Sequence, residues 1–283
     1  MHADLHCHTH YSDGAHSPRD LLERALENNV THLAITDHDC TDAVTESRRL
    51  ASELSPALSI VPGVEISCDW QGRELHVVGL GIETGAPALK SLLETHQARR
   101  RDRVESMNRI LEQAGTSGLS RFIEELPCIS VTRSHVATYL VEKGLCRNRR
   151  KAFHSWLRKG KKLYVPITWQ GLGDAVAAIS AAGGLAVLAH PGRYGLTKTR
   201  LGRLLQDFSE AGGHGIETHY AQEDPLTCAQ LATLADEHQL FQSVGSDFHD
   251  AALPYKTAPG QYTRFFNGTK KNAIWDHPGW HLE

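Results

Sequence analysis

The 283-residue sequence lacks paired cysteines, long apolar runs and a strong net charge. Its six cysteines are scattered without any C-x-x-C pair, which argues against a disulfide framework or a zinc knuckle and favours reduced thiols. No apolar run approaches the roughly 18 residues of a membrane span, and the start MHADLHCHTH has neither the basic segment nor the apolar core of a signal peptide. We therefore expect a cytoplasmic, globular protein with no membrane partner.

Short strand-like runs alternate with amphipathic helical segments along most of the chain. Ser17 and Pro18 supply an N-cap and a favoured first helical residue for SPRDLLERALENN, and HLAITDHD then predicts a buried strand. Glycine pairs at 183–184 and 212–213 lie where two helix ends need a left-handed residue. Such alternation predicts a mostly parallel sheet or barrel, and the hydrophobic content of 40% is enough for a sizeable core.

Histidines are frequent, and several lie with carboxylates at the ends of predicted strands. On a strand, His6 and His8 would project to the same face. Residues at or just past other strand ends, or facing inward from ELHVV, are His38, Glu65, His76, His190, Asp247 and His249. Imidazole and carboxylate without thiolate suit Zn, Mn or Fe, and barrel enzymes build their sites at strand ends. A capped or solvent-facing histidine explains any one position, but convergence favours a metal site. The other histidines, including His96, are expected at the surface, and His219 is left open.

The middle of the chain is strongly basic. Residues 97–163 contain sixteen Lys or Arg against six Asp or Glu, a net charge of +10, so the remainder carries −13. Helical periodicity here interrupts the alternation and predicts a helical insertion at 97–165 over a site built by barrel segments 1–96 and 166–283. A solvated basic face is the simpler explanation of such a run. Beside an acidic metal cluster, however, the basic residues indicate an anionic substrate.

Five basic side chains are candidates for holding a phosphate group that is not cleaved. Arg133 and His135 lie at the start of a predicted helix, where free backbone amides and the helix dipole favour an anion. Arg158 and Lys159 lie in the next predicted loop, and Arg193 follows the strand LAVLAHP. For His135, an ordinary position in the first turn of a helix is the alternative.

Six motifs resemble, in order, those of the polymerase and histidinol phosphatase (PHP) superfamily: DLHCHTHYSDG, AITDHD, PGVEIS, ELHVVGL, LAHPGRY and GSDFH. VTRSHVATYLVEKG and RKGKKLYVP also resemble its bacterial branch of 3',5'-nucleotide bisphosphate phosphatases and 5'-to-3' exoribonucleases. The resemblance implies an α/β fold, a distorted (β/α)7 barrel of the PHP type with a helical insertion domain. It is weakest in DAALPYKTAPGQYTRFF, after His249.

The resemblance also implies a site for three divalent ions, expected to be Mn²⁺, with Zn²⁺ or Fe²⁺ as alternatives. By carry-over, the ligands are His6, His8, Asp13, His38, Glu65, His76, His190, Asp247 and His249. One ion would take His6, His8, Glu65 and Asp247, a second Glu65, His76 and His190, and a third Asp13, His38 and His249. A hydroxide bridging the first two ions would attack phosphorus, and no residue is assigned as general acid.

Together these features predict a metal-dependent phosphoesterase. It would remove the 3'-phosphate of nucleoside 3',5'-bisphosphates and degrade short 5'-phosphorylated RNA from 5' to 3', with no obligate protein partner. One alternative is a histidinol-phosphate-type phosphatase, whose small zwitterionic substrate needs fewer cations than the basic insertion offers. Another is a non-catalytic PHP module that binds nucleic acid, which should have lost metal ligands.

Overall fold

Seven strands form one sheet that curls into a nearly closed barrel. The computed structural model describes residues 1–221, 223–252, 258–262 and 272–281. Backbone hydrogen bonds from Leu5 N to Val244 O (3.0 Å) and from Asp247 N to His6 O (2.8 Å) join the chain after the first strand to the chain after the last. The predicted seven-stranded barrel is confirmed. The strands pair in chain order as β1 (Ala3–Asp4), β2 (His32–Ile35), β3 (Ser59–Trp70), β4 (Arg73–Leu80), β5 (Leu185–Leu188), β6 (Gly215–His219) and β7 (Phe241–Val244).

Strand β4 runs antiparallel to both of its neighbours, whereas the other pairings are parallel. It follows β3 through a two-residue turn, with Trp70 opposite Arg73. Gln71 and Gly72 both have positive φ angles, of 52° and 74°. A type I′ hairpin turn requires this combination, because its twist matches that of the flanking strands. The hairpin carries Glu65 and the inward-facing His76 on adjacent strands of the barrel.

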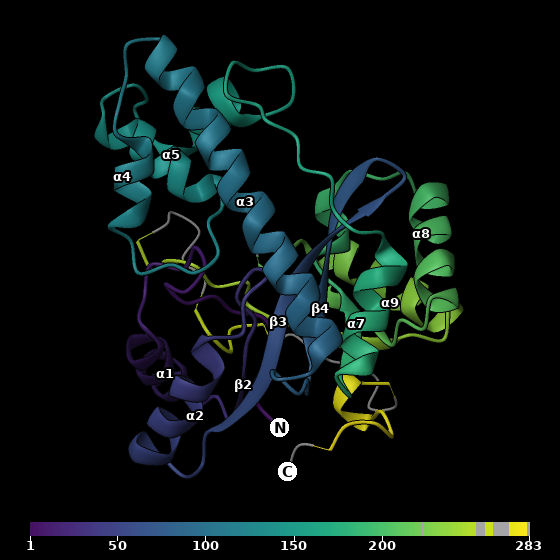
Figure 1. The fold of residues 1–283 in the computed structure, drawn as a ribbon. Coiled ribbons are helices and arrows are strands. Elements are labelled where there is room, and N and C mark those ends of the chain that lie inside the picture. Colours follow the sequence, from purple (N-terminus) through teal and green to yellow (C-terminus); the bar gives the residue numbers. More distant parts are fainter. Residues whose placement is uncertain (222, 253–257, 263–271, 282–283) are drawn as a thin grey trace.

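Helices cover the outside of the barrel on two sides (Figure 1). Ser17 caps the first of them, as predicted, by accepting a hydrogen bond from Asp20 N (3.2 Å). Side chains from successive strands, including Ala3, Ala34 and Val61, form an apolar cluster with Ile274 of the short 3₁₀ helix η3 (Ile274–Asp276). The covering helices are α1 (Pro18–Glu27), α2 (Ala43–Leu54), α7 (Leu172–Ala181), α8 (Lys198–Glu210) and α9 (Pro225–Glu237).

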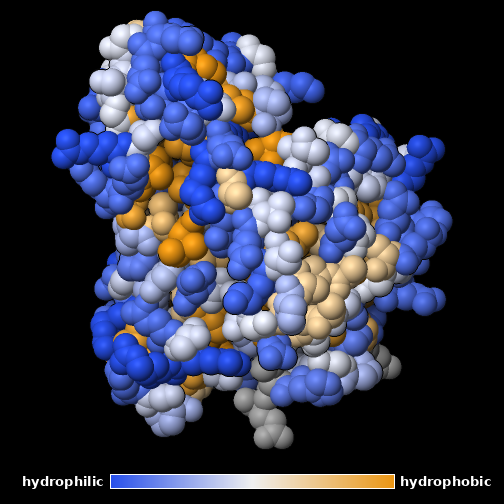
Figure 2. Space-filling model, viewed as in Figure 1, coloured by the Kyte–Doolittle hydropathy of each residue, from blue (hydrophilic) through white to orange (hydrophobic). Residues whose placement is uncertain are grey.

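The basic segment forms a helical lobe beside the barrel mouth (Figure 1). Its exterior is predominantly hydrophilic on the face in Figure 2, and its own apolar cluster includes Met107, Tyr139 and Leu163. No helix among the described residues is both long and apolar enough to cross a membrane. The elements are α3 (Pro87–Gln113), α4 (Leu119–Glu124), α5 (Arg133–Glu142), α6 (Arg149–Ala152) and the π-helix η1 (Phe153–Leu157). The predicted start of the insertion, residue 97, lies inside α3, which is one unbroken helix. The division into barrel segments and insertion therefore remains a prediction.

Two local expectations are wrong. The first strand is shorter than the sequence predicts. Strand β1 ends at Asp4, and in the segment that follows only Cys7 forms an isolated bridge, with Phe248. His6 and His8 therefore lie past the strand, where they pair with the segment after β7. His96 is not at the surface but fully buried, and its ring nitrogens lie 2.8 Å from Asp39 Oδ1 and 2.6 Å from Gln170 Oε1, just before α7.

Gly245 gives a test of this close packing at the barrel mouth. A Cβ atom at this position would overlap the backbone nitrogen and Cβ of His6. We expect G245A to lower the free energy of unfolding by about 1–3 kcal/mol, because overpacking forces the backbone to shift. Urea unfolding measures the change. G173A is the control, since Gly173 lies on α7 with open space around it. Equal stability of G245A and the wild type would contradict this packing.

Candidate metal centre

The structure brings the nine predicted ligand residues together at the barrel mouth. Three of them, His6, His8 and Glu65, are completely buried. Their ligand atoms fall into four overlapping groups in which all atoms lie within 4.8 Å of one another. The groups are His8, Asp13, His38 and His249; His6, His8 and Asp247; His6, Glu65 and His190; and His38, Glu65 and His76. This arrangement is that of a polynuclear metal site.

The atoms around His6 and His8 have the spacing of ligands that share one ion. The two Nε2 atoms are 3.1 Å apart, and Glu65 Oε2 lies 3.4 Å from each. Asp247 Oδ1 lies 3.5 Å from His6 Nε2 and 3.3 Å from His8 Nε2. Tetrahedral ligands with bonds of about 2.1 Å stand about 3.4 Å apart, so the atoms of His6, His8 and Asp247 have the spacing of ligands on a single zinc-sized or manganese-sized ion.

Glu65 connects this group to the rest of the centre. Its Oε1 lies 2.8 Å from both His76 Nδ1 and His190 Nε2. Its Oε2 approaches His38 Nδ1 to 2.8 Å, yet neither atom has a hydrogen-bond partner. The buried Asp13 Oδ1 also lacks one, although His249 Nε2 is only 3.2 Å away. Buried polar atoms are almost always satisfied, so these unsatisfied atoms fit cations as their missing partners.

The charges of the centre favour cations. Burial raises the pKa of a carboxyl group, but for Glu65 the imidazoles of His38 and His76 outweigh this effect and hold its pKa well below the usual value. Burial and the neighbouring His249 lower the pKa of His8 to about 3, so its ring is neutral and can donate a lone pair. In His76, carboxylates overcome the effect of burial and raise the pKa to about 10. The ionised carboxylates thus attract positive charge to this end of the cavity, as a proton on His76 or as bound cations.

Glu217 orients two of the predicted ligands, although it was not among the site residues predicted from the sequence. Its Oε1 lies 2.7 Å from His6 Nδ1, and its Oε2 accepts a hydrogen bond from the backbone N–H of His190 at 2.7 Å. A proton held on Nδ1 leaves the lone pair of His6 Nε2 facing the cluster. Asp37 similarly fixes the loop before Asp13 by accepting hydrogen bonds from the N–H groups of residues 9 and 12. In the sequence, Asp37 and Glu217 each lie near the apolar end of a predicted strand, HLAITDHD and GIETHY. A carboxylate in such a position was the signal that could have identified both.

Backbone strain also collects at this site. His190 and Asp247 adopt positive φ angles of 29° and 47°, and Asp39, next to His38, has a φ of 45°. Non-glycine residues rarely adopt such angles and do so mainly where the surrounding structure compels them. Here the strain turns His190 and Asp247 toward the cavity immediately after β5 and β7.

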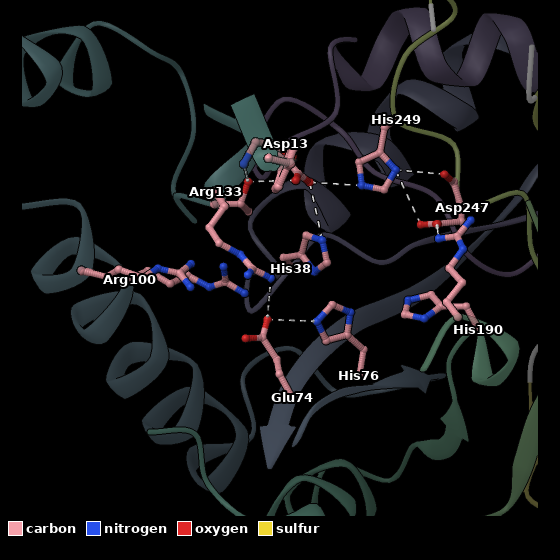
Figure 3. Close-up of a pocket in the computed structure, with 14 residues that line it drawn as sticks. Asp13, His38, Glu74, His76, Arg100, Arg133, His190, Asp247 and His249 are labelled. Carbon is pink, nitrogen blue, oxygen red and sulfur yellow. Dashed lines mark hydrogen bonds and ion pairs between the residues drawn. The ribbon is translucent and has the colours of Figure 1, made fainter. Parts of the chain in front are cut away.

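Arginines line the opposite end of a cavity of about 230 Å³ that opens onto the centre. Figure 3 shows Arg100 and Arg133 entering it from one side and His190 and Asp247 from the other. Arg103, Glu74 and Phe153 also line it, and Phe153 is the one hydrocarbon side chain among its described lining residues. Within the sequence RRRDR, no feature except helix phase distinguishes the arginines that face the cavity from those that face solvent.

Of the five residues predicted to contact phosphate, two line the cavity and three do not. Arg133 and Arg193 line the cavity, and Arg193 is hydrogen-bonded to Asp247. Arg158 and Lys159 are not among the lining residues. His135 lies in the first turn of α5, where its Nδ1 accepts a hydrogen bond from the backbone N–H of residue 132 at 3.0 Å. A phosphate contact of these last three residues stays a prediction.

We expect E217Q to weaken binding of Mn²⁺ by about 10- to 100-fold, the usual effect of losing a group that orients a metal ligand. The amide has a single acceptor oxygen, whereas Glu217 serves both His6 and His190. Calorimetric titration of chelator-stripped protein measures the affinity. E210Q, in an exposed carboxylate of α8, is the control. Equal affinities for Mn²⁺ in E217Q and the wild type would rule out this orienting role.

Comparison with known proteins agrees with this geometry. The PHP domain model matches residues 4–188. The chain is 42% identical over 247 residues to the 5'-3' exoribonuclease Rnm of Escherichia coli (strain K12), covering 87% of this chain and 84% of that protein. It is 40% identical over 250 residues to the 3',5'-nucleoside bisphosphate phosphatase of Chromobacterium violaceum, covering 87% and 86%. A solved amidohydrolase structure from C. violaceum, with bound sulfate, matches 89% of each chain with a TM-score of 0.83 and 38% identity. The chain belongs to the PHP domain family.

Proposed function

We propose that the chain is a metal-dependent phosphoesterase acting on nucleoside 3',5'-bisphosphates and short 5'-phosphorylated RNA. The observation that carries this proposal is a single cavity with clustered carboxylates and imidazoles at one end and arginines at the other. One end suits metal ions, and the other suits an anion that the metal ions do not reach. Relatives about 40% identical are named as exactly these two kinds of enzyme.

The nine clustered residues would hold three divalent ions, with Mn²⁺ the expected metal. Such ions, when bound, supply an activated water and neutralise charge on the phosphoryl group. His249 donates from Nδ1 to the Asp247 carbonyl oxygen at 2.9 Å, which keeps Nε2 free as a ligand atom. Glu65, with both oxygens facing imidazoles, is placed to bridge two ions.

The substrate phosphates would be held by groups at the cavity wall. Arg133 begins α5, whose N-terminal backbone amides favour an anion, and its side chain is partly exposed toward the cavity. Arg193 lies at the rim beside Asp247, where it can contact the phosphate that is cleaved. Guanidinium groups offer two parallel N–H donors to a phosphate, which fixes its orientation.

A nucleotide fits this cavity better than a small phosphate monoester. The Phe153 ring can stack on a nucleobase, and stacking on aromatic side chains is worth about 1–3 kcal/mol per base. The insertion at 97–165 would act as a substrate cap, because it supplies Phe153, Arg133 and other lining arginines. A histidinol-phosphate-type substrate would leave this basic end unused, and a non-catalytic module would not need nine converging ligands.

One site would serve both substrates. A 5'-phosphate held at the arginine end places the 3'-phosphate of a bisphosphate at the metal centre. In RNA with a 5'-phosphate, the first phosphodiester takes the place of that 3'-phosphate. Hydrolysis of the bond between phosphorus and O3' there would release a nucleoside 5'-monophosphate and leave the phosphate on the 5' end of the shortened RNA, so repeated cycles would degrade the RNA from its 5' end.

We expect 3'-phosphoadenosine 5'-phosphate to be hydrolysed with a higher kcat/KM than adenosine 3'-monophosphate, and EDTA to abolish both activities. R133A should raise KM for the bisphosphate about 10- to 100-fold, because a hydrogen bond to a charged group is worth about 1.5–3 kcal/mol. Steady-state kinetics with Mn²⁺-loaded protein measures these values. R121A is the control, since the Arg121 side chain is exposed to solvent.

Two results would contradict the proposal. One is hydrolysis of histidinol phosphate or simple monophosphates as fast as that of the bisphosphate. The other is degradation of 5'-hydroxyl RNA and 5'-phosphoryl RNA at equal rates, which would show that no 5'-phosphate is recognised.

A further inference from the structure

One face of α3 carries three buried basic side chains toward the cavity. His96, Arg100 and Arg103 follow one another at helical spacing and are 0%, 4% and 5% exposed. The first two have a protein anion: Asp39 Oδ1 lies 2.8 Å from His96 Nδ1, and Asp39 Oδ2 accepts from Arg100 Nε at 2.9 Å. Arg100 also donates to the hydroxyl of Ser67 at 2.9 Å. These contacts satisfy the first two members of the row.

Arg103 differs from its neighbours because it has no such partner. No hydrogen bond or ion pair joins its side chain to any residue that the structure describes. Glu74, whose charge attracts Arg103, lies 3.5 Å from Arg133 Nη2 and 3.8 Å from His76 Nε2, so it already faces two other basic groups. Arg103 lines the cavity, which places its guanidinium within reach of a ligand.

A buried guanidinium without an anion is costly. Burial and the repulsion of Arg100 and Arg133 outweigh the attraction of Glu74 and Asp39 and lower the pKa of Arg103 to about 9, which still leaves it charged at neutral pH. Arg133 and Arg193 already have carboxylate partners in Glu74 and Asp247. A bound anion therefore gains most at Arg103, because it relieves an unpaired charge and displaces no existing ion pair.

We propose that Arg103 is the principal contact for the substrate phosphate that is not cleaved, the 5'-phosphate of a nucleotide or an RNA. This inference rests on the proposed function and refines it: Arg133 orients the phosphate at the helix N-terminus, and Arg103 supplies the uncompensated charge. Substrates without a 5'-phosphate would leave Arg103 buried and unpaired. The 5'-phosphate is thus recognised by a buried arginine that lines the cavity and not by the exposed basic clusters.

The test compares wild-type protein with R103M and R103Q, which remove the charge but retain most of the side-chain volume. R101A is the matched control, because Arg101 is exposed on the same helix. With Mn²⁺-loaded protein, the two neutral variants should raise KM for 3'-phosphoadenosine 5'-phosphate about 10- to 100-fold while leaving KM for adenosine 3'-monophosphate nearly unchanged. Affinity for adenosine 5'-monophosphate, measured by calorimetry, should fall by a similar factor.

Equal KM values in the wild type and a folded R103Q, or equal increases for both substrates, would overturn the assignment. Thermal melting establishes which of the two variants is folded. If the wild type does not hydrolyse the bisphosphate, the proposed function fails, and the calorimetric comparison still decides the role of Arg103. Unchanged affinity of R103Q for adenosine 5'-monophosphate then contradicts it.

Discussion

The buried Glu65 carboxylate is the constraint on which the rest of the structure depends. An ionised carboxylate without contact to water is costly unless cations or hydrogen bonds compensate it. Here imidazoles from separate segments of the barrel approach it, with His38, His76 and His190 all at 2.8 Å. His6, His38 and His190 come from loops that follow β1, β2 and β5, whereas His76 lies on β4, so the compensation requires a nearly closed barrel. Metal ions would complete it, because several of these atoms lack hydrogen bonds.

Contacts between buried carboxylates and basic side chains also join the helical lobe to the barrel. Asp39, one residue after His38, pairs with His96 and Arg100 of α3. At the start of α5, the hydroxyl of Thr132 donates to Asp13 Oδ2 at 2.8 Å. The loops that present the predicted metal ligands are therefore held by the helices that present arginines. This coupling fixes the distance between the two ends of the cavity, which is what a substrate with two phosphates requires.

Much of this architecture is predictable because its signals are local. Capping residues such as Ser17 and alternating hydrophobic runs indicate the helices and strands, and acids or imidazoles at strand ends indicate the centre. The remaining features depend on contacts distant in sequence. His96 can be buried because the carboxylate of Asp39, 57 residues away, accepts a hydrogen bond from its ring. Arg100 and Arg101 are chemically identical neighbours in one basic run, and only the phase of α3 buries Arg100 and exposes Arg101.

The central claim is that the converging carboxylates and imidazoles are ligands of three metal ions. The most direct measurement is an anomalous difference map from crystals of Mn²⁺-loaded protein, collected at the manganese absorption edge. The account predicts three peaks at the barrel mouth, one among His6, His8, Glu65 and Asp247, one beside His76 and His190, and one beside Asp13, His38 and His249. A map without peaks there, from protein that retains full activity, would contradict it.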